Sequence, residues 1–273
     1  MEQDFTAWVG RSVTRTDVVS PRLLAEFRAT LSPFLFEQEA TVAPPGFHFT
    51  LAPAMPVASD TGPDGAERKG LFLPPIALPR RMWAGGSIET FRPLMAGAGV
   101  SRTSTIADLR WKRGQGGLLC LVTIRHDIAD EDGISITEQQ DLIFREAATA
   151  PAVLPGPQTE GNSDWTVEAS PLLLFRFSAL TFNGHRIHYD LAYAEEEGYP
   201  GLLVHGPLQA ALMLNLASAR AGHVPRRFAY RCLAPLFGGE AFGVACDEQG
   251  GTRIIRCDGV TTAEGQAHAR GTG

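Results

Sequence analysis

The chain has 273 residues, 44% of them hydrophobic and 20% charged, which is enough to bury one large core or two smaller ones. Its net charge of -6 offers no basic surface for a phosphate backbone, so we expect no nucleic-acid partner. The four cysteines are far apart, no apolar run reaches the roughly 18 residues of a membrane span, and residues 1–10 do not resemble a signal peptide. These features predict a cytoplasmic protein with no membrane partner.

The first block of the chain reads as one helix among several strands. A strand is predicted over residues 13–19 and a helix over 21–31, with Ser20 as the N-cap and Pro21 in the first helical position. After a loop rich in Pro and Gly, alternating apolar residues predict strands over residues 85–92, 100–112, 117–128 and 135–145.

A second segment rich in Pro, Gly and Ser, residues 147–164, separates this block from another of similar character. We therefore predict two domains, residues 1–146 and residues 165–273, joined by a linker over 147–164.

The second block is predicted to repeat the plan in a shorter form. Strands are expected over residues 172–182, 227–233, 240–247, 252–257 and 260–268. The helix predicted over residues 207–221 is apolar on nearly every face, so it must be enclosed by other elements. An antiparallel sheet curled around this helix is the simplest enclosure, which predicts an α+β fold.

Candidate catalytic residues gather before this helix. Three of the seven histidines, His185, His188 and His205, lie between the preceding element and the helix start. His188 titrates near neutral pH and suits a general base, while the Asn183 amide can orient a water molecule. The free backbone N–H groups near Gly206 can receive the negative charge that develops on a thioester oxygen when water adds to a conjugated double bond.

Four segments carry a resemblance to a known superfamily. They are TFNGHRIHYD (residues 181–190), YPGLLVHGPLQAAL (199–212), MWAGGSIETFRPL (82–94) and FAYRCLAPLFGGEAF (228–242). The chain resembles the MaoC-like, R-specific enoyl-CoA hydratase superfamily, and within it the double hot-dog branch. That branch contains itaconyl-CoA and 3-methylfumaryl-CoA hydratases and mitochondrial-type 3-hydroxyacyl-thioester dehydratases.

The resemblance implies two fused hot-dog units, each an antiparallel sheet wrapped around a central helix. Residues 1–146 would form a degenerate unit that completes the acyl pocket, and residues 165–273 would form the catalytic unit. It further implies an acyl-CoA substrate, no resident cofactor because coenzyme A is part of the substrate, and a homodimer as the expected assembly.

Residue roles follow by position in the superfamily motif, which reads Asp, any residue, Asn, Pro, an aliphatic residue and His. His188 matches the catalytic histidine, and Gly206 matches the glycine that donates to the oxyanion. Asn183 stands where Asp is usual, while His185 and Arg186 replace the Asn and Pro. This departure assigns proton transfer mainly to His188 and leaves Asn183 as the group that orients water.

The leading hypothesis is reversible hydration of a short, dicarboxylic enoyl-CoA such as itaconyl-CoA or 3-methylfumaryl-CoA. The alternatives are a 3-hydroxyacyl-thioester dehydratase of fatty-acid or polyketide synthesis, a hot-dog thioesterase, and a non-catalytic acyl-CoA binding protein. Arg186 is a candidate contact for the second carboxylate, in competition with Arg80, Arg81 and Arg110.

His185 and His205 are candidate substrate contacts, with structural hydrogen bonding as the alternative. No metal is expected, because the H-E-x-x-H pattern is missing and the hydration chemistry requires none.

Overall fold

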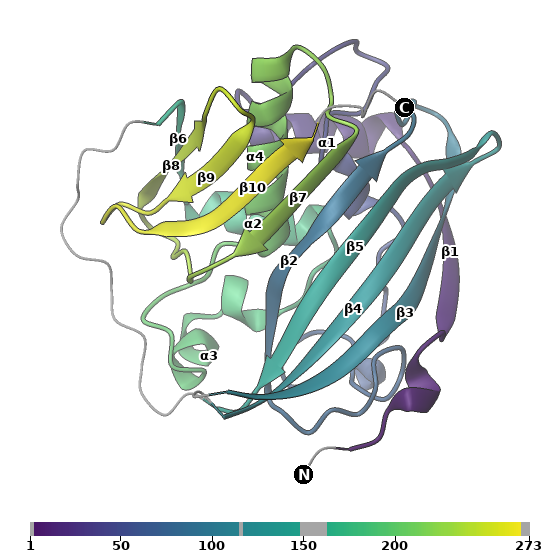
Figure 1. Cartoon of the computed structure of the whole chain (residues 1–273), viewed down its shortest axis with the longest axis vertical. Coiled ribbons are helices and arrows are strands. Elements are labelled where there is room, and N and C mark those ends of the chain that lie inside the picture. Colours follow the sequence, from purple (N-terminus) through teal and green to yellow (C-terminus); the bar gives the residue numbers. More distant parts are fainter. Residues whose placement is uncertain (1–2, 115–116, 148–162, 269–273) are drawn as a thin grey trace.

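The computed structural model describes residues 3–114, 117–147 and 163–268. Ten strands form one antiparallel sheet in the order β1-β3-β4-β5-β2-β7-β10-β9-β8-β6 (Figure 1). The N-terminal half of the sheet consists of β1 (Ser12–Val18), β2 (Arg80–Thr90), β3 (Gly99–Gly114), β4 (Gly117–Asp130) and β5 (Gly133–Arg145). The C-terminal half consists of β6 (Trp165–Glu168), β7 (Arg227–Cys232), β8 (Ala241–Cys246), β9 (Gly251–Ile255) and β10 (Thr261–His268).

Four helices and four 3-10 turns complete the described structure. The helices are α1 (Pro21–Leu31), α2 (Pro171–Leu180), α3 (Leu191–Glu196) and α4 (Gly206–Ala221). The 3-10 turns are η1 (Thr6–Trp8), η2 (Phe47–Thr50), η3 (Ala58–Asp60) and η4 (Arg186–His188). None of the helices in the described part of the chain has the length and apolarity needed to cross a membrane.

The strand order is the same in the two halves. The order β1-β3-β4-β5-β2 of the first half corresponds to β6-β8-β9-β10-β7 of the second, and the sheet is continuous because β2 pairs with β7. This repeated topology confirms the double hot-dog arrangement within an α+β fold. The division into residues 1–146 and 165–273 stays a prediction, and residues 148–162 of the predicted linker lie outside the described residues.

The seam between the halves depends on two glycines of β2. Strand β2 pairs with β5 on one side and β7 on the other, and it contains a bulge between Trp83 and Gly85. A Cβ atom on Gly85 would collide with the carbonyl oxygen of Tyr230, and one on Gly86 with that of Gln139. Glycine therefore allows three strands to approach closely here.

Helix α4 is the core of the C-terminal half, and the prediction over residues 207–221 is confirmed to within one residue. The helix lies against β7, β8, β9 and β10 and also contacts β2. The buried amide of Asn215 is satisfied, because it donates to the carbonyl oxygens of Pro45 (2.7 Å) and Ala211 (2.8 Å) and accepts from the N–H of Phe36 (2.9 Å). Gly222, with φ of 72°, ends the helix in the left-handed conformation.

The N-terminal half contains no equivalent of α4 among its described residues. Residues 33–79 carry only the short turns η2 and η3, and the buried side chains of Phe47, Phe49 and Leu51 fill the space next to the sheet. Gly46 lies on α4, where a Cβ atom would be 2.7 Å from that of Ala211. The N-terminal half thus differs from the C-terminal half in having no enclosed central helix among its described residues, and its role as a degenerate unit that completes the acyl pocket stays a prediction.

One predicted strand is wrong. Residues 172–182 form most of helix α2 instead, because Ser170 caps the helix by accepting from the N–H of Leu173 (3.2 Å) and Pro171 occupies the first helical position. The same Ser-Pro start begins α1, which packs against α2. The run of Leu and Phe after Pro171 also has the continuous apolar pattern of a buried strand, so this pattern alone does not distinguish a strand from a helix.

The other predicted strands overlap observed ones, although β2 begins earlier, at Arg80. Strand β6 and helix α3 were not predicted, because both are short and lie beside segments rich in loop-forming residues.

Candidate active site

His188 lies in the turn η4 and is almost fully buried. Its Nδ1 atom is 2.9 Å from the carbonyl oxygen of Leu203. Because a carbonyl oxygen only accepts hydrogen bonds, Nδ1 carries the proton, and Nε2 of the neutral ring keeps its lone pair. The fold therefore presents Nε2 of His188 as a base.

His205 connects this base to the start of α4. The two imidazole rings stack with their centroids 3.6 Å apart and an interplanar angle of 19°. Nε2 of His205 shares a 2.8 Å hydrogen bond with Oγ of Ser178 on α2. Since His205 is the N-cap residue of α4, the stack brings the His188 base to the helix N-terminus.

His185 and Asn183 shape the loop before the base. The Asn183 side-chain oxygen accepts from the N–H of His185 (3.0 Å), an Asx-type turn. The His185 ring meets that of His188 edge to face at 5.6 Å, and its buried Nε2 has no hydrogen-bond partner within the described residues. The amide nitrogen of Asn183 is thus the atom left for its predicted contact with water.

Gly206 begins α4. The first hydrogen bond of the helix runs from the N–H of Gln209 to the carbonyl oxygen of His205 (3.2 Å), and residue 207 is a proline without an N–H. The N–H of Gly206 consequently has no partner inside the helix and lies at the positive end of its dipole. Trp83 of β2 covers this position, since a Cβ atom on Gly206 would lie 2.9 Å from the Trp83 Cγ atom.

Burial keeps the three histidines neutral. Burial, together with the nearby cation of Arg81, lowers the pKa of His188 to about 4, although the hydrogen bond to Leu203 acts in the opposite direction. Burial also lowers the pKa values of His185 and His205 well below the ordinary value. At neutral pH the neutral imidazole of His188 is the form that a general base requires.

The N-terminal half holds the catalytic loop in place. The N–H of Arg186 donates to the carbonyl oxygen of Asp64 (2.8 Å), and its guanidinium donates to that of Pro63 (3.1 Å). Gly65 lies against Gly184 so closely that a Cβ atom on Gly65 would collide with the Gly184 carbonyl oxygen. The loop over residues 62–66 is therefore part of the site although it is far away in the sequence.

Arg186 points away from the role predicted for it. Its guanidinium donates from two nitrogens to the same oxygen of Asp190, Oδ2 (3.0 and 2.7 Å), and lies over the ring of Tyr193 at 4.4 Å. These contacts use most of its donors in holding the loop together. Its contact with substrate stays a prediction that the geometry does not favour.

The chain is similar to known proteins over most of its length. A mesaconyl-C(4)-CoA hydratase from Chloroflexus aurantiacus is 41% identical over 240 residues, which cover 86% of this chain and 85% of that protein. The profile of the family described as hydroxyacyl-thioester dehydratase type 2 matches residues 46–238. The chain belongs to this family.

Solved structures show the same fold. HtdX from Mycobacterium tuberculosis superposes with a TM-score of 0.67 at 18% identity, covering 94% of this chain and 100% of that one. A second Mycobacterium tuberculosis protein, described as having a double hotdog fold, superposes with a TM-score of 0.53 at 14% identity and 94% coverage of each chain. The protein is thus a MaoC-like double hot-dog member of the hydroxyacyl-thioester dehydratase type 2 family, and a hydro-lyase.

The structure brings five of the six predicted site residues to one place. His185, His188, His205, Asn183 and Gly206 converge through the contacts described above, whereas the Arg186 guanidinium is held by Asp190. Within the described residues, no group of three or more His, Cys, Asp or Glu side chains is arranged to hold a metal ion.

Sequence reasoning missed three further residues that lie against the predicted site residues, namely Trp83, Ser178 and Gly65. Trp83 and Gly65 reach the site only through contacts between the two halves, which no local spacing reveals. Ser178 carried a usable signal, because a polar residue on the buried face of an apolar helix requires a partner.

Proposed function

We propose that this hydro-lyase reversibly hydrates the double bond of a short enoyl-CoA that carries a second carboxylate. The observation that supports this most directly is the placement of a neutral base, Nε2 of His188, at the N-terminus of α4. Addition of water to a conjugated thioester needs a base that takes a proton from the water and a hydrogen-bond donor that stabilises negative charge on the thioester oxygen. His188 and the N–H of Gly206 are the groups proposed for these two tasks.

The proposed reaction proceeds as follows. His188 Nε2 removes a proton from water as the hydroxide oxygen bonds to the β-carbon. Negative charge moves through the α-carbon to the thioester oxygen, where the Gly206 N–H stabilises it. The imidazolium then returns the proton to the α-carbon, so that the net change is the addition of one water molecule. No resident cofactor takes part, and coenzyme A arrives with the substrate.

The dicarboxylic substrate is proposed from the relative of highest identity named above. Mesaconyl-C(4)-CoA carries a free carboxylate in its acyl group, and 41% identity over most of both chains supports a related substrate. The family description supports the reverse direction, dehydration of a 3-hydroxyacyl thioester, as the second candidate. The same residues would serve both directions, because a catalyst accelerates a reversible step in each.

A substrate panel tests the proposal. The protein is incubated with crotonyl-CoA, itaconyl-CoA and 3-methylfumaryl-CoA, and the products are detected by mass. A gain of one water molecule is expected. Release of free CoA would indicate a thioesterase, and three unchanged substrates would indicate a binding protein; either outcome overturns the proposal.

The catalytic base is tested in the same assay with His188→Ala. We expect the rate to fall by about 100- to 10,000-fold, the usual contribution of a general acid-base group. His223→Gln is the matched control, because His223 is exposed at the far end of α4 and should have no effect. Full activity in the His188 variant would remove this mechanism.

A further inference from the structure

A row of buried polar side chains crosses the inner face of the sheet in the N-terminal half. Ser104 of β3, His126 of β4 and Glu138 of β5 occupy directly paired positions. Hydrogen bonds connect Ser104 Oγ to His126 Nδ1 (2.7 Å) and His126 Nε2 to Oε1 of Gln140 (2.8 Å). Because residues two apart on a strand share a face, Arg102 of β3 belongs to the same row.

This row divides the interior into two apolar clusters. On β4, Ile128 belongs to the cluster around α4, and Ile124 belongs to a second cluster, with His126 between them. On β5, Ile136 and Leu142 stand in the same relation to the row. Buried polar side chains destabilise a fold unless they have hydrogen-bond partners, so each polar atom of the row is expected to have one.

The partners within the row do not satisfy all of its atoms. The guanidinium of Arg102 contacts Oε2 of Glu138 (3.4 Å) and the carbonyl oxygen of Leu51 (3.3 Å). His48 of η2 places Nε2 3.8 Å from the same Oε2 atom. Nε2 of His48 and Oε1 of Glu138 are buried, and neither has a hydrogen-bond partner among the residues that the structure describes.

The charge balance of the row is incomplete as well. Burial raises the pKa of Glu138 to about 7, although Arg102 acts in the opposite direction, and burial lowers the pKa of His48 to about 3. Glu138 can therefore take up a proton near neutral pH, and His48 stays neutral. The contact between Arg102 and Glu138 is long, at 3.4 Å, and it loses its charge when Glu138 is protonated.

A chain of side-chain contacts connects this row to Gly206, where the thioester is proposed to lie. Trp83, which covers Gly206, donates from Nε1 to the hydroxyl oxygen of Tyr230 (3.0 Å), and Tyr230 pairs across β2 with the position of Gln140. The rings of Phe49 and Trp83 meet edge to face, and the rings of His48 and Phe49 are tilted by 36° with their centroids 4.2 Å apart.

The distance along α4 also fits a short acyl group. Gly46, two residues before His48, packs on Ala211, which is about 7.5 Å along the helix axis from Gly206. An acyl group whose thioester lies at Gly206 therefore has its free end near this row if it is only a few carbons long.

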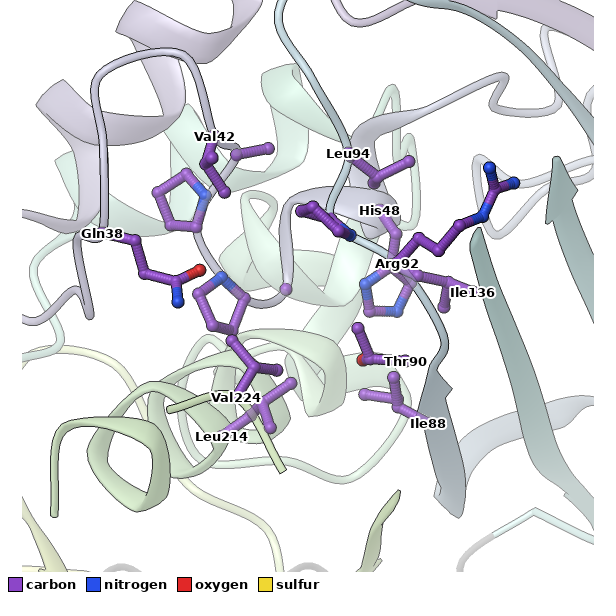
Figure 2. Close-up of a pocket in the computed structure, with 15 residues that line it drawn as sticks. Gln38, Val42, His48, Ile88, Thr90, Arg92, Leu94, Ile136, Leu214 and Val224 are labelled. Atoms are coloured by element: carbon purple, nitrogen blue, oxygen red, sulfur yellow. The ribbon is translucent and has the colours of Figure 1, made fainter. Parts of the chain in front are cut away.

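Next to the row, the interior is not fully filled. A pocket of about 40 Å³ is lined by His48, Ile88, Ile136 and Leu214 (Figure 2). Arg92, which lines this pocket, directs its guanidinium away from His48 and pairs with Asp130 at 2.7 Å (Figure 2). Arg102, in the row beside the pocket, has a longer contact of 3.4 Å with Glu138.

We propose that Arg102, with His48 and Tyr230 as neutral donors, binds the free carboxylate of a short dicarboxylic acyl group. This proposal rests on the proposed function and deepens it by naming the residues that select the substrate. A carboxylate gives Arg102 a second anion besides the distant Glu138, and it accepts from the unpartnered Nε2 of His48 and from the hydroxyl of Tyr230. An apolar acyl end would leave Nε2 of His48 without a partner.

Binding of unreactive thioesters tests this site separately from catalysis. Succinyl-CoA and butyryl-CoA have acyl chains of equal length and differ by one terminal carboxylate. Titration calorimetry on the full chain should show succinyl-CoA binding about 10- to 100-fold more tightly, as a charged hydrogen bond provides. Equal affinities in the wild-type protein would overturn the proposal.

Two variants locate the effect. The double variant Arg102→Met with Glu138→Gln removes both charges, so no unpaired ion stays buried, and it should bind the two thioesters equally while its affinity for butyryl-CoA is unchanged. Glu138→Gln alone keeps Arg102 and should retain the preference. Circular dichroism verifies folding, and if the double variant does not fold, Arg81→Gln decides: retention of the preference there supports the proposal, and its loss overturns it.

Arg81→Gln is the competing arm, because Arg81 lies near His185 and His188 and has a long contact of 3.5 Å with Asp64. Loss of the succinyl preference in this variant, with the preference intact in the double variant, would place the carboxylate at Arg81 and overturn the proposal. Failure of the proposed function looks different, because the protein would then hydrate neither crotonyl-CoA nor a dicarboxylic enoyl-CoA, whatever the binding ratio.

Discussion

The hydrogen bond between Nδ1 of His188 and the carbonyl oxygen of Leu203 decides which nitrogen of the ring can act. A histidine on a flexible loop would exchange its proton between the two nitrogens, whereas here one tautomer is held. The stacked ring of His205 and its hydrogen bond to Ser178 limit rotation of His188 as well. A single loop histidine is thereby converted into an oriented base.

Asn183 is the residue at which this chain departs from the superfamily motif, and it yields a prediction. Asn183→Asp should keep most of the activity, because a carboxylate oxygen can accept from the His185 N–H as the amide oxygen does. Asn183→Ala should lose at least about tenfold in rate, since the Asx turn loses its acceptor. Initial hydration rates on crotonyl-CoA measure both, and an inactive but folded Asp variant would show that the amide N–H is indispensable.

At the scale of elements, the start of α4 must be glycine for two reasons, contact with Trp83 and approach of the thioester. Gly206→Ala places a Cβ atom 2.9 Å from the Trp83 ring. Alanine keeps the N–H, but this collision displaces it, so we expect the hydration rate to fall by up to about 100-fold, the size of effect seen when an oxyanion donor is lost. Gly201→Ala is the control, because a Cβ atom there meets nothing within 4 Å. Equal rates in the two variants would contradict this role.

The loop over residues 62–66 gives a second prediction at this scale. Gly65→Ala should shift the catalytic loop, because the new methyl group collides with the Gly184 carbonyl oxygen. Gly97→Ala introduces the same backbone strain, with φ of 86° against 83°, but its methyl group meets nothing within 4 Å. Gly65→Ala should lose more thermal stability than Gly97→Ala because of this collision, and only Gly65→Ala should lower the hydration rate of the folded protein. A similar loss of rate in both would remove the positioning role.

At the scale of the whole molecule, buried neutral histidines link stability to pH. Burial lowers the pKa values of His48, His126, His185, His188 and His205. Below the ordinary histidine pKa of about 6.5 the unfolded chain binds more protons than the folded one, so stability is complete above that pH and is lost as the pH falls toward 4. Because the pKa of Glu138 is raised, the folded chain binds a proton there that the unfolded chain does not bind in this pH range. This effect on stability offsets that of one of the five histidines.

The urea midpoint should therefore fall steadily between pH 6.5 and pH 4. Each histidine whose effect is not offset removes about 1.4 kcal/mol of unfolding free energy per pH unit. His188→Gln should reduce the slope by one such contribution. A midpoint that does not change across this pH range would show that these rings are not buried in the neutral form.

Much of the secondary structure follows from short-range patterns. Helix α4 could be predicted because a segment apolar on every face must be enclosed, and α1 because Ser20 and Pro21 mark its start. The same Ser-Pro signal was available at Ser170 for α2, but the apolar run that follows suits a buried strand equally well. Local sequence is ambiguous there because helix and strand can bury the same residues.

The sequence by itself determined which residues make up the catalytic loop, that one helix is enclosed, and that the order of strands repeats. Each of these features depends on neighbours along the chain. Only the tertiary structure decided the long-range contacts. Trp83 covers Gly206, Gly65 packs against Gly184, and Arg102 and Glu138 lie in one buried row. These contacts join residues far apart in the sequence, and their register depends on how β2 pairs with both β5 and β7. Such pairing depends on the complete sheet, so it cannot be predicted from any single segment of the sequence.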